Sequence, residues 1–246
     1  MIHYHGGPIS DSSAAVTVYK GRHAMVSYAN PGQLPLVAEV CQSFSLDNGA
    51  YSFWNSDKEV DWNGYYEWVD EWKNHPGFDF ALIPDVIDGH ELKNIGLLSD
   101  WPHGALNGVG CPIWHLHESL DRLVAWSRAY PRIALGSSGE YKTVGTSVWW
   151  NRMREVFNLL CDKNGRPPCK IHGLRMLDPN IYKHFPLSSA DSTNVARNVN
   201  LDQRWKGTYQ PPNKKSRGLI LAERIEMEQS ACCWEKIPFQ HAFVGM

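Results

Sequence analysis

The sequence has no long apolar run, no cysteine framework and no excess of positive charge. No window approaches the ~18 consecutive apolar residues of a membrane-spanning helix, and the first residues lack the basic and apolar regions of a signal peptide. The 6 cysteines are scattered, which predicts reduced thiols instead of a disulfide scaffold. We therefore expect a soluble, cytoplasmic protein.

Positive charge is not in excess overall, but it gathers in one late stretch. A net charge of -2 argues against a protein that coats nucleic acid nonspecifically, because phosphate binding draws on clustered Lys and Arg. We predict a basic rim loop at about 194–217 that either contacts nucleic acid or is simply solvated. Its cations are Arg197, Arg204, Lys206, Lys214, Lys215 and Arg217.

The 246 residues suit one large α/β domain, close to the ~250 residues of an eight-fold barrel. Short apolar runs typical of strands alternate with helical stretches, which favours parallel strands joined by right-handed crossovers. The expected strands are 2–5, 24–28, 43–46, 78–83, 112–116, 132–135, 170–176 and 187–190, and the clearest helices are 64–73, 120–130, 146–161 and a C-terminal one at about 219–229.

We predict a single (β/α)8 TIM-type barrel over residues 1–246. An open doubly wound sheet is the alternative. Closure is favoured because candidate polar groups follow early, middle and late strands, and only a closed barrel brings the first and last together.

Three aspartates stand where apolar runs end: Asp47, Asp85 and Asp191. The carboxyl ends of barrel strands hold the chemistry of this fold. Carboxylates brought there can supply a nucleophile, a group that transfers protons and an acceptor that recognises a polar ligand, which suits exchange at a glycosidic bond. Each aspartate taken singly is equally explained by a turn or a helix N-cap.

The ordered set of motifs around these aspartates resembles the tRNA-guanine transglycosylase family over about residues 40 to 200. Residues 45–52 resemble its Asp-Ser-Gly-Gly-Tyr/Phe-Gln motif, 83–85 its Phe-Asp-Glu, 133–140 its Gly-Gly-Leu-Ala-Val-Gly-Glu, 170–173 its strand leading to glycine, and 189–192 its Met-Phe-Asp-Cys.

The chain departs from that family in length and in metal ligands. The family closes with a Cys-x-Cys-x-x-Cys zinc site and a histidine, whereas this chain offers only Cys232, Cys233 and a distant His241. We expect no zinc subdomain, no other metal and no cofactor. The shorter length and the opening at 5–9 look more like the phage and bacterial branch that places 7-deazaguanines into DNA, so DNA is expected ahead of tRNA.

The resemblance implies a role for each matching residue. Asp191 would be the nucleophile at C1′, and Asp47 would carry the proton, a role that requires a raised pKa. The implied substrate-binding residues are Asp85, Asp88, Tyr51, His115, His117, Gly136, Ser137 and His172. Either His115 or His117 falls where relatives carry a base-contacting glutamine.

Two other functions remain open from the sequence. The pairs His3-x-His5 and His115-x-His117, with His172 and Asp191, could form the metal site of a barrel hydrolase. A catalytically silent nucleic-acid-binding barrel that partners an active subunit is the third hypothesis.

Overall fold

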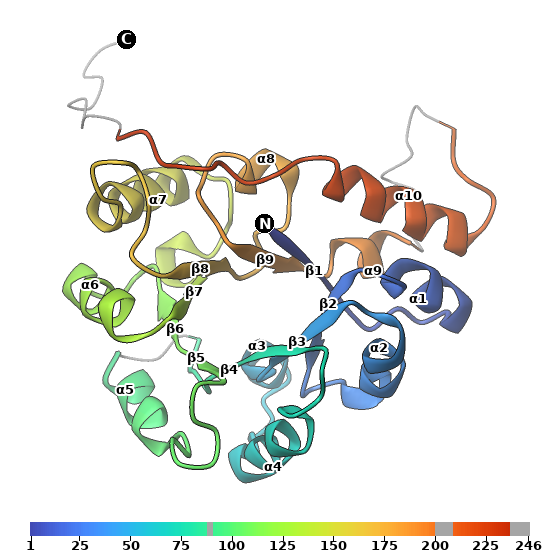
Figure 1. The fold of residues 1–246 in the computed structure, drawn as a ribbon, viewed down its shortest axis with the longest axis horizontal. Coiled ribbons are helices and arrows are strands. Elements are labelled where there is room, and N and C mark those ends of the chain that lie inside the picture. The colour runs from blue at the N-terminus through green and yellow to red at the C-terminus, as the bar shows by residue number, and fades with distance from the viewer. Residues whose placement is uncertain (88–90, 200–208, 237–246) are drawn as a thin grey trace.

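A closed parallel barrel surrounded by helices forms the body of the protein (Figure 1). The computed structural model describes residues 1–87, 91–199 and 209–236. All strand pairs are parallel, in the order β5-β4-β3-β2-β1-β9-β8-β7-β6. The strands are β1 Ile2–Gly6, β2 His23–Ser27, β3 Ser43–Asp47, β4 Phe78–Leu82, β5 Gly110–Cys111, β6 Ile113–His115, β7 Arg132–Gly136, β8 Lys170–Gly173 and β9 Ser189–Ser192.

Pro112 joins the two ends of this sheet. It separates β5, which pairs with β4, from β6, which pairs with β7. Proline has no N–H to give to a strand ladder, which interrupts the hydrogen bonding there, yet its carbonyl still accepts from the N–H of Ala134 at 2.9 Å. β5 and β6 are thus one continuous barrel strand, and the predicted eight-stranded barrel is confirmed.

Helices follow the strands and cover the outside of the barrel. Their N-termini are capped by the side chains of Asp11, Asp61, Ser119, Thr146, Asp178 and Asn213. The helices are α1 Ser12–Tyr19, α2 Leu34–Val40, α3 Ala50–Trp54, α4 Trp62–Trp72, α5 Glu91–Asp100, α6 Leu120–Ala129, α7 Ser147–Leu160, α8 Pro179–Tyr182, α9 Asn194–Asn198 and α10 Lys214–Glu226, with short 3-10 turns at Pro31–Gln33 and Gly139–Tyr141. Within the described ranges, none is long and apolar enough to cross a membrane.

The prediction of a rim loop at about 194–217 is wrong at both ends that the structure describes, because both ends are helical. Arg197 lies in α9, and Lys214 begins α10, so the C-terminal helix starts five residues before the predicted 219 and ends at Glu226. Asn213 accepts the N–H of Ser216 and thereby starts the helix, a capping signal that the prediction overlooked. α10 packs closely on α1, because a Cβ at Gly218 would lie 2.7 Å from Val18.

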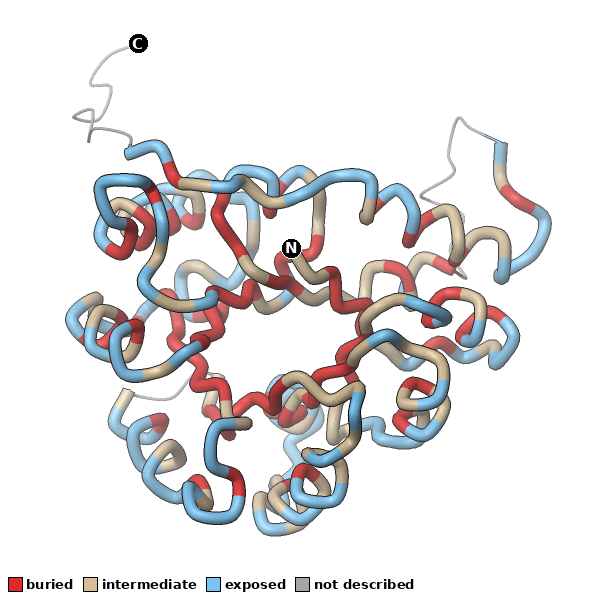
Figure 2. Tube along the Cα trace, viewed as in Figure 1, coloured by how far each residue is buried: buried red, intermediate tan, exposed pale blue. Residues whose placement is uncertain are grey.

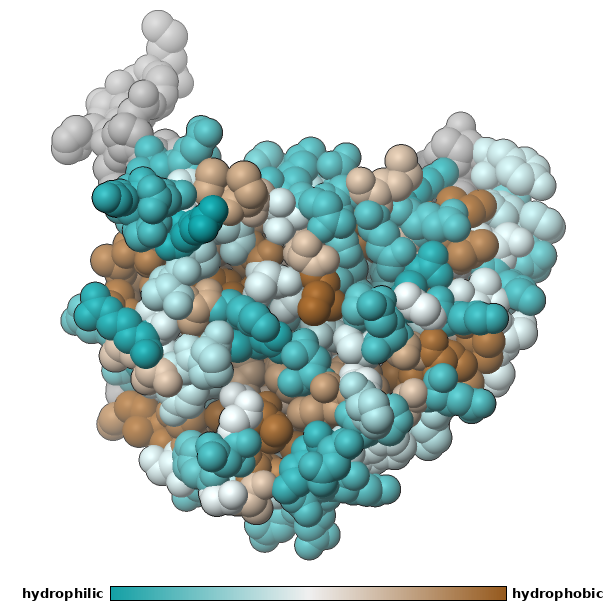
Figure 3. All heavy atoms as spheres, viewed as in Figure 1, coloured by the Kyte–Doolittle hydropathy of each residue, from teal (hydrophilic) through white to brown (hydrophobic). Residues whose placement is uncertain are grey.

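The core has two parts, one inside the barrel and one between the strands and helices. Figure 2 shows that buried residues follow the ring of strands and recur along the surrounding helices. The inner cluster includes Tyr4, Phe80 and Leu82. At the amino ends of the strands, Arg132 donates to both oxygens of Asp79 at 2.9 and 3.1 Å. Side chains fill the barrel axis at this end, where the N-terminus lies, and hydrophilic residues predominate on that face (Figure 3).

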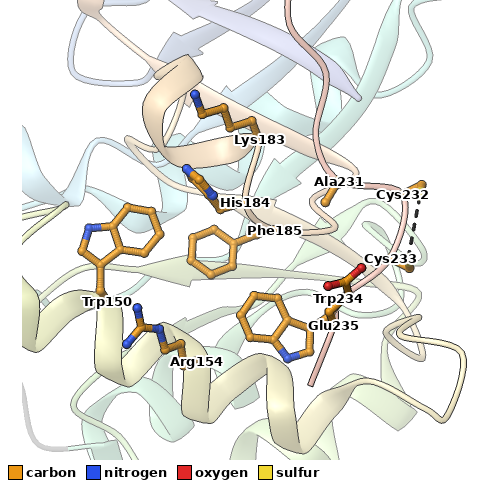
Figure 4. A pocket seen from close by; sticks show the side chains of 10 residues that line it. All are labelled: Trp150, Arg154, Lys183, His184, Phe185, Ala231, Cys232, Cys233, Trp234 and Glu235. Atoms are coloured by element: carbon orange, nitrogen blue, oxygen red, sulfur yellow. Dashed lines mark hydrogen bonds between the residues drawn. The ribbon is translucent and has the colours of Figure 1, made fainter. Parts of the chain in front are cut away.

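The segment after α10 runs back across the helices and is held by an aromatic stack (Figure 4). Trp234 stacks on Phe185 with ring centroids 5.7 Å apart, and Phe185 also stacks on Phe157 and Trp150. The sulfurs of the neighbouring Cys232 and Cys233 lie 3.7 Å apart as free thiols.

Candidate active site

A cavity of about 520 Å³ opens at the carboxyl ends of the strands. This is the end of a parallel barrel at which catalytic side chains gather, and the volume suits a small-molecule ligand. Eight of the predicted residues line it, and they come from the early, middle and late parts of the chain. They are Asp47, Tyr51, Asp85, His115, Gly136, Ser137, Asp191 and Arg197.

Asp47 is the last residue of β3, and the chain turns sharply after it. Gly49 has φ of +78°, a conformation that glycine adopts without strain, and its N–H donates to Asp47 Oδ2 at 3.3 Å. Burial, together with the negative charges of Asp191 and Asp85, raises the pKa of Asp47 to about 7 against the opposing hydrogen bond from Ser27. At neutral pH this carboxyl can therefore either give or take a proton.

Asp191 lies in β9, opposite Tyr4 of β1. Its Oδ1 accepts the backbone N–H of Arg175 at 2.9 Å, and Nε2 of His172 lies 3.4 Å from the same oxygen. The backbone of Arg175 has φ of +60°, a strained conformation for a residue with a side chain. These contacts fix a carboxylate at the cavity wall, where it could act as a nucleophile.

Asp85 follows β4 and joins a buried hydrogen-bond network. Nδ2 of Asn48 donates to its Oδ1, and Nε2 of His115 lies 2.8 Å from its Oδ2. Burial lowers the pKa of His115, but the hydrogen bond and charge of Asp85 outweigh it, so the pKa is raised above its ordinary value. The buried pair thus presents both an acceptor and an imidazole to the cavity.

A second layer of polar residues supports His115. Glu118 accepts its backbone N–H at 3.1 Å and also binds Asn94 and Arg122. Nδ1 of His115 is buried with no hydrogen-bond partner among the described residues, and it lies close to Gly136, where a Cβ would approach it to 2.8 Å. A side chain at 136 would therefore displace the imidazole.

Aromatic rings and a guanidinium lie around the cavity opening. Tyr51 and Trp54 of α3 are 41% and 47% exposed, with their ring centroids 5.8 Å apart. The guanidinium of Arg175 lies 4.7 Å from the centroid of the Tyr51 ring. Flat ligands could stack here. Asn48 and Arg175 were missed from the sequence, because Asn48 was interpreted as a turn residue and 170–176 as strand throughout.

Several predicted residues lie elsewhere. His117 is exposed and bonds Ser138 at 2.6 Å, so His115 is the histidine of the cavity. His172 does not line the cavity but lies behind Asp191, fully buried. Asp88, Arg204 and Lys206 fall outside the described residues. Lys214, Lys215 and Arg217 line a separate hollow with Asp11 and Ser13.

The histidine pairs do not converge in the way that the hydrolase hypothesis requires. Tyr4 points into the barrel, so His3 and His5 point outward, where His5 meets Glu226 of α10 at 2.8 Å. Only His115 of the second pair reaches the cavity. In the part of the chain that the structure describes, no three His, Cys, Asp or Glu side chains are grouped to hold a metal ion.

In comparisons with protein-family models, curated proteins and solved structures, none matches this chain. The geometry of the cavity and the motifs that resemble the transglycosylases are therefore the features that point to a function.

Proposed function

We propose that this protein is a glycosyltransferase that exchanges guanine in DNA for a 7-deazaguanine base, preQ0-like, by a retaining double displacement. The observation that carries the proposal is one cavity in which a fixed carboxylate, Asp191, shares space with Asp47, whose pKa is about 7. Retaining exchange at a sugar carbon needs this pair: a nucleophile and a group that alternates between acid and base.

In the first step a lone pair of Asp191 attacks C1′ of the target nucleoside and forms a sugar ester. The C1′–N9 bond breaks, its electrons pass to the purine, and protonated Asp47 gives its proton to the leaving guanine. In the second step Asp47 takes the N9 proton of the incoming 7-deazaguanine, whose nitrogen attacks C1′ and returns the bonding electrons to Asp191. Two inversions leave the configuration unchanged.

Recognition of the base is assigned to the buried network. Asp85 would accept from the amino and ring N–H groups of the base, and its orientation by Asn48 and His115 suits that role. Tyr51 supplies a face for stacking, and Gly136 and Ser137 supply the adjacent wall.

DNA is proposed as the polymer from the motifs and from the cavity opening. A base can reach so deep a cavity only when it leaves the helix or begins unpaired. Exposed Tyr51 and Trp54 offer stacking surfaces to unstacked bases, and Arg175 and Arg197 can approach phosphates. The opening at 5–9, which looks more like the DNA-modifying branch of the family, favours DNA over tRNA.

Nucleoside mass spectrometry tests reaction, polymer and base together. The protein is incubated with duplex DNA, single-stranded DNA or tRNA and with 7-cyano- or 7-aminomethyl-7-deazaguanine, and the digested polymer is analysed for the new nucleoside. Incorporation into DNA is expected. No incorporation into any polymer, with no release of guanine, would refute the exchange.

Asp191→Ala is expected to abolish both exchange and the covalent adduct, because no other described carboxylate is held in its place. Asp47→Asn should still bind DNA while exchange falls by roughly 100-fold or more, the usual order for loss of a general acid-base group. Denaturing gels of the protein with labelled DNA detect the adduct. Normal turnover by Asp191→Ala would show that the nucleophile is assigned wrongly.

A further inference from the structure

The two oxygens of Asp191 are in different surroundings. Oδ1 receives the N–H of Arg175 at 2.9 Å and faces Nε2 of His172 at 3.4 Å. No hydrogen bond to Oδ2 is recorded among the described residues. One oxygen is therefore held by the protein, and the other is left to the cavity.

The ring of His172 is held so that Nε2 faces the carboxylate. Nδ1 lies 2.8 Å from Oγ of Ser189, and the side chain is fully buried. The rings of Tyr4 and Phe80 pack edge-on at 6.0 and 5.2 Å. Nε2 has no hydrogen bond to any described residue, and Oδ1 of Asp191 lies 3.4 Å from it.

A polar atom buried this deeply is costly unless it interacts with a polar group. If the Ser189 hydroxyl donates to Nδ1, the ring proton resides on Nε2 and points at Asp191. The β8–β9 pairing supports this geometry, since His172 stands directly opposite Ser189. The hydroxyl can thus set the tautomer, as a second hydrogen bond to a histidine commonly does.

We propose that His172 is a positioning residue for the nucleophile, holding Oδ1 together with the Arg175 backbone so that Oδ2 attacks the sugar. This inference rests on the proposed function. The Oδ2 lone pair forms the bond to C1′, and Oδ1 becomes the carbonyl oxygen of the ester. The donors on Oδ1 need not move during this step.

The same donors act most strongly when the ester breaks. As the incoming base attacks C1′, the C1′–Oδ2 electrons return to the carboxylate, and negative charge develops on both oxygens. Donors already directed at Oδ1 stabilise that charge without reorganisation. Loss of the His172 donor should therefore slow breakdown of the ester more than its formation, so that the adduct accumulates.

A pair of amide variants separates this role from packing. In His172→Gln the amide nitrogen can occupy the place of Nε2 and still donate to Asp191. In His172→Asn the amide reaches only the place of Nδ1 and keeps the contact with Ser189. Both variants introduce the same chemical group into the same buried site, so their thermal stabilities provide a check on general damage.

We expect turnover of His172→Asn to fall roughly 10- to 100-fold, the order that follows when a reacting group is misplaced. The KM for the incoming base should change little, and the fraction of enzyme trapped as DNA adduct should rise. His172→Gln should recover most of the turnover. Ser189→Ala should share part of the defect, whereas Ser188→Ala should not, because Oγ of Ser188 bonds the carbonyl of Ile171.

The outcomes separate this inference from the proposed function. Wild-type turnover and adduct fraction in His172→Asn would overturn the positioning role while the exchange reaction stands. Equal loss in both amide variants with equally lowered thermal stability would also overturn it, since that result reports packing. If the wild-type protein forms no adduct and exchanges no base, the proposed function fails first.

Discussion

Asp47→Asn should make the protein more stable at alkaline pH while it impairs exchange. The amide keeps the shape of the carboxyl and an oxygen that can accept the N–H of Gly49. It cannot ionise, so it removes the cost of a negative charge in a buried site next to Asp191 and Asp85. Stability and activity should thus change in opposite directions, as is common at catalytic sites.

The size of the expected gain in stability, and the pH range in which it appears, follow from the pKa of Asp47. The carboxyl ionises near 3.8 in the unfolded chain and near 7 in the folded protein. The contribution of the protonated Asp47 carboxyl to the free energy of unfolding is complete below pH 3.8, declines as the pH rises, and is lost above about 7. A gap of about 3 pH units corresponds to about 4 kcal/mol for a side chain cut off from water.

Asp47 is partly open to the cavity, which screens its charge and reduces this figure. We expect a gain of about 2 kcal/mol in the variant above pH 8, with little gain near pH 4. For a domain of this size that gain raises Tm by roughly 4 to 8 °C. Thermal unfolding of both proteins followed by circular dichroism between pH 4 and 9 measures it.

Asp100→Asn, at an exposed position, is the matched control and should leave the pH dependence of Tm unchanged. A difference in Tm between Asp47→Asn and the wild-type protein that is the same at every pH would refute a raised pKa of Asp47. Such a result would mean that the carboxyl does not retain its proton in the folded protein.

Three further changes test other parts of the structure. Gly136→Ala should weaken base binding, measured by titration of the base, and should also lower Tm, because its Cβ would lie 2.8 Å from Nδ1 of the buried His115 and would displace that ring. Phe185→Ala should lower the free energy of unfolding by about 3–5 kcal/mol in urea titrations, because this fully buried ring joins three aromatic stacks. Lys214→Glu with Lys215→Glu should weaken DNA binding and flatten its dependence on salt.

Each of these predictions has its own check. Gly104→Ala, where no atom lies near the added methyl, should leave base affinity unchanged. A loss below about 1 kcal/mol for Phe185→Ala would contradict the packing argument. Acidic residues in the first turn of α10 favour the helix, so weaker DNA binding could not be ascribed to unfolding. Lys20→Glu with Lys163→Glu is the control pair. If both pairs weaken DNA binding equally, the effect comes from the change in net charge and not from the position of Lys214 and Lys215.

The sequence by itself determined the alternation of parallel strands and helices and the end of the strands at which the carboxylates lie. Alternating apolar runs and helices imply parallel strands, and parallel strands end on one rim, so Asp47, Asp85 and Asp191 could be brought together without coordinates. Local patterns served less well within helices. In α7 the apolar Val148 is exposed, whereas Trp149 beside it is fully buried.

Tertiary structure alone decided which neighbours each side chain meets. Closure of the barrel depends on the pairing of β1 with β9, which lie far apart in sequence, and the choice of His115 over His117 depends on the strand ending between them. The backbone donor at Arg175, the imidazole behind Asp191 and the raised pKa of Asp47 all arise from burial and long-range contacts. A linear pattern specifies the order of residues along a strand, but proton affinity depends on everything packed around the group in three dimensions.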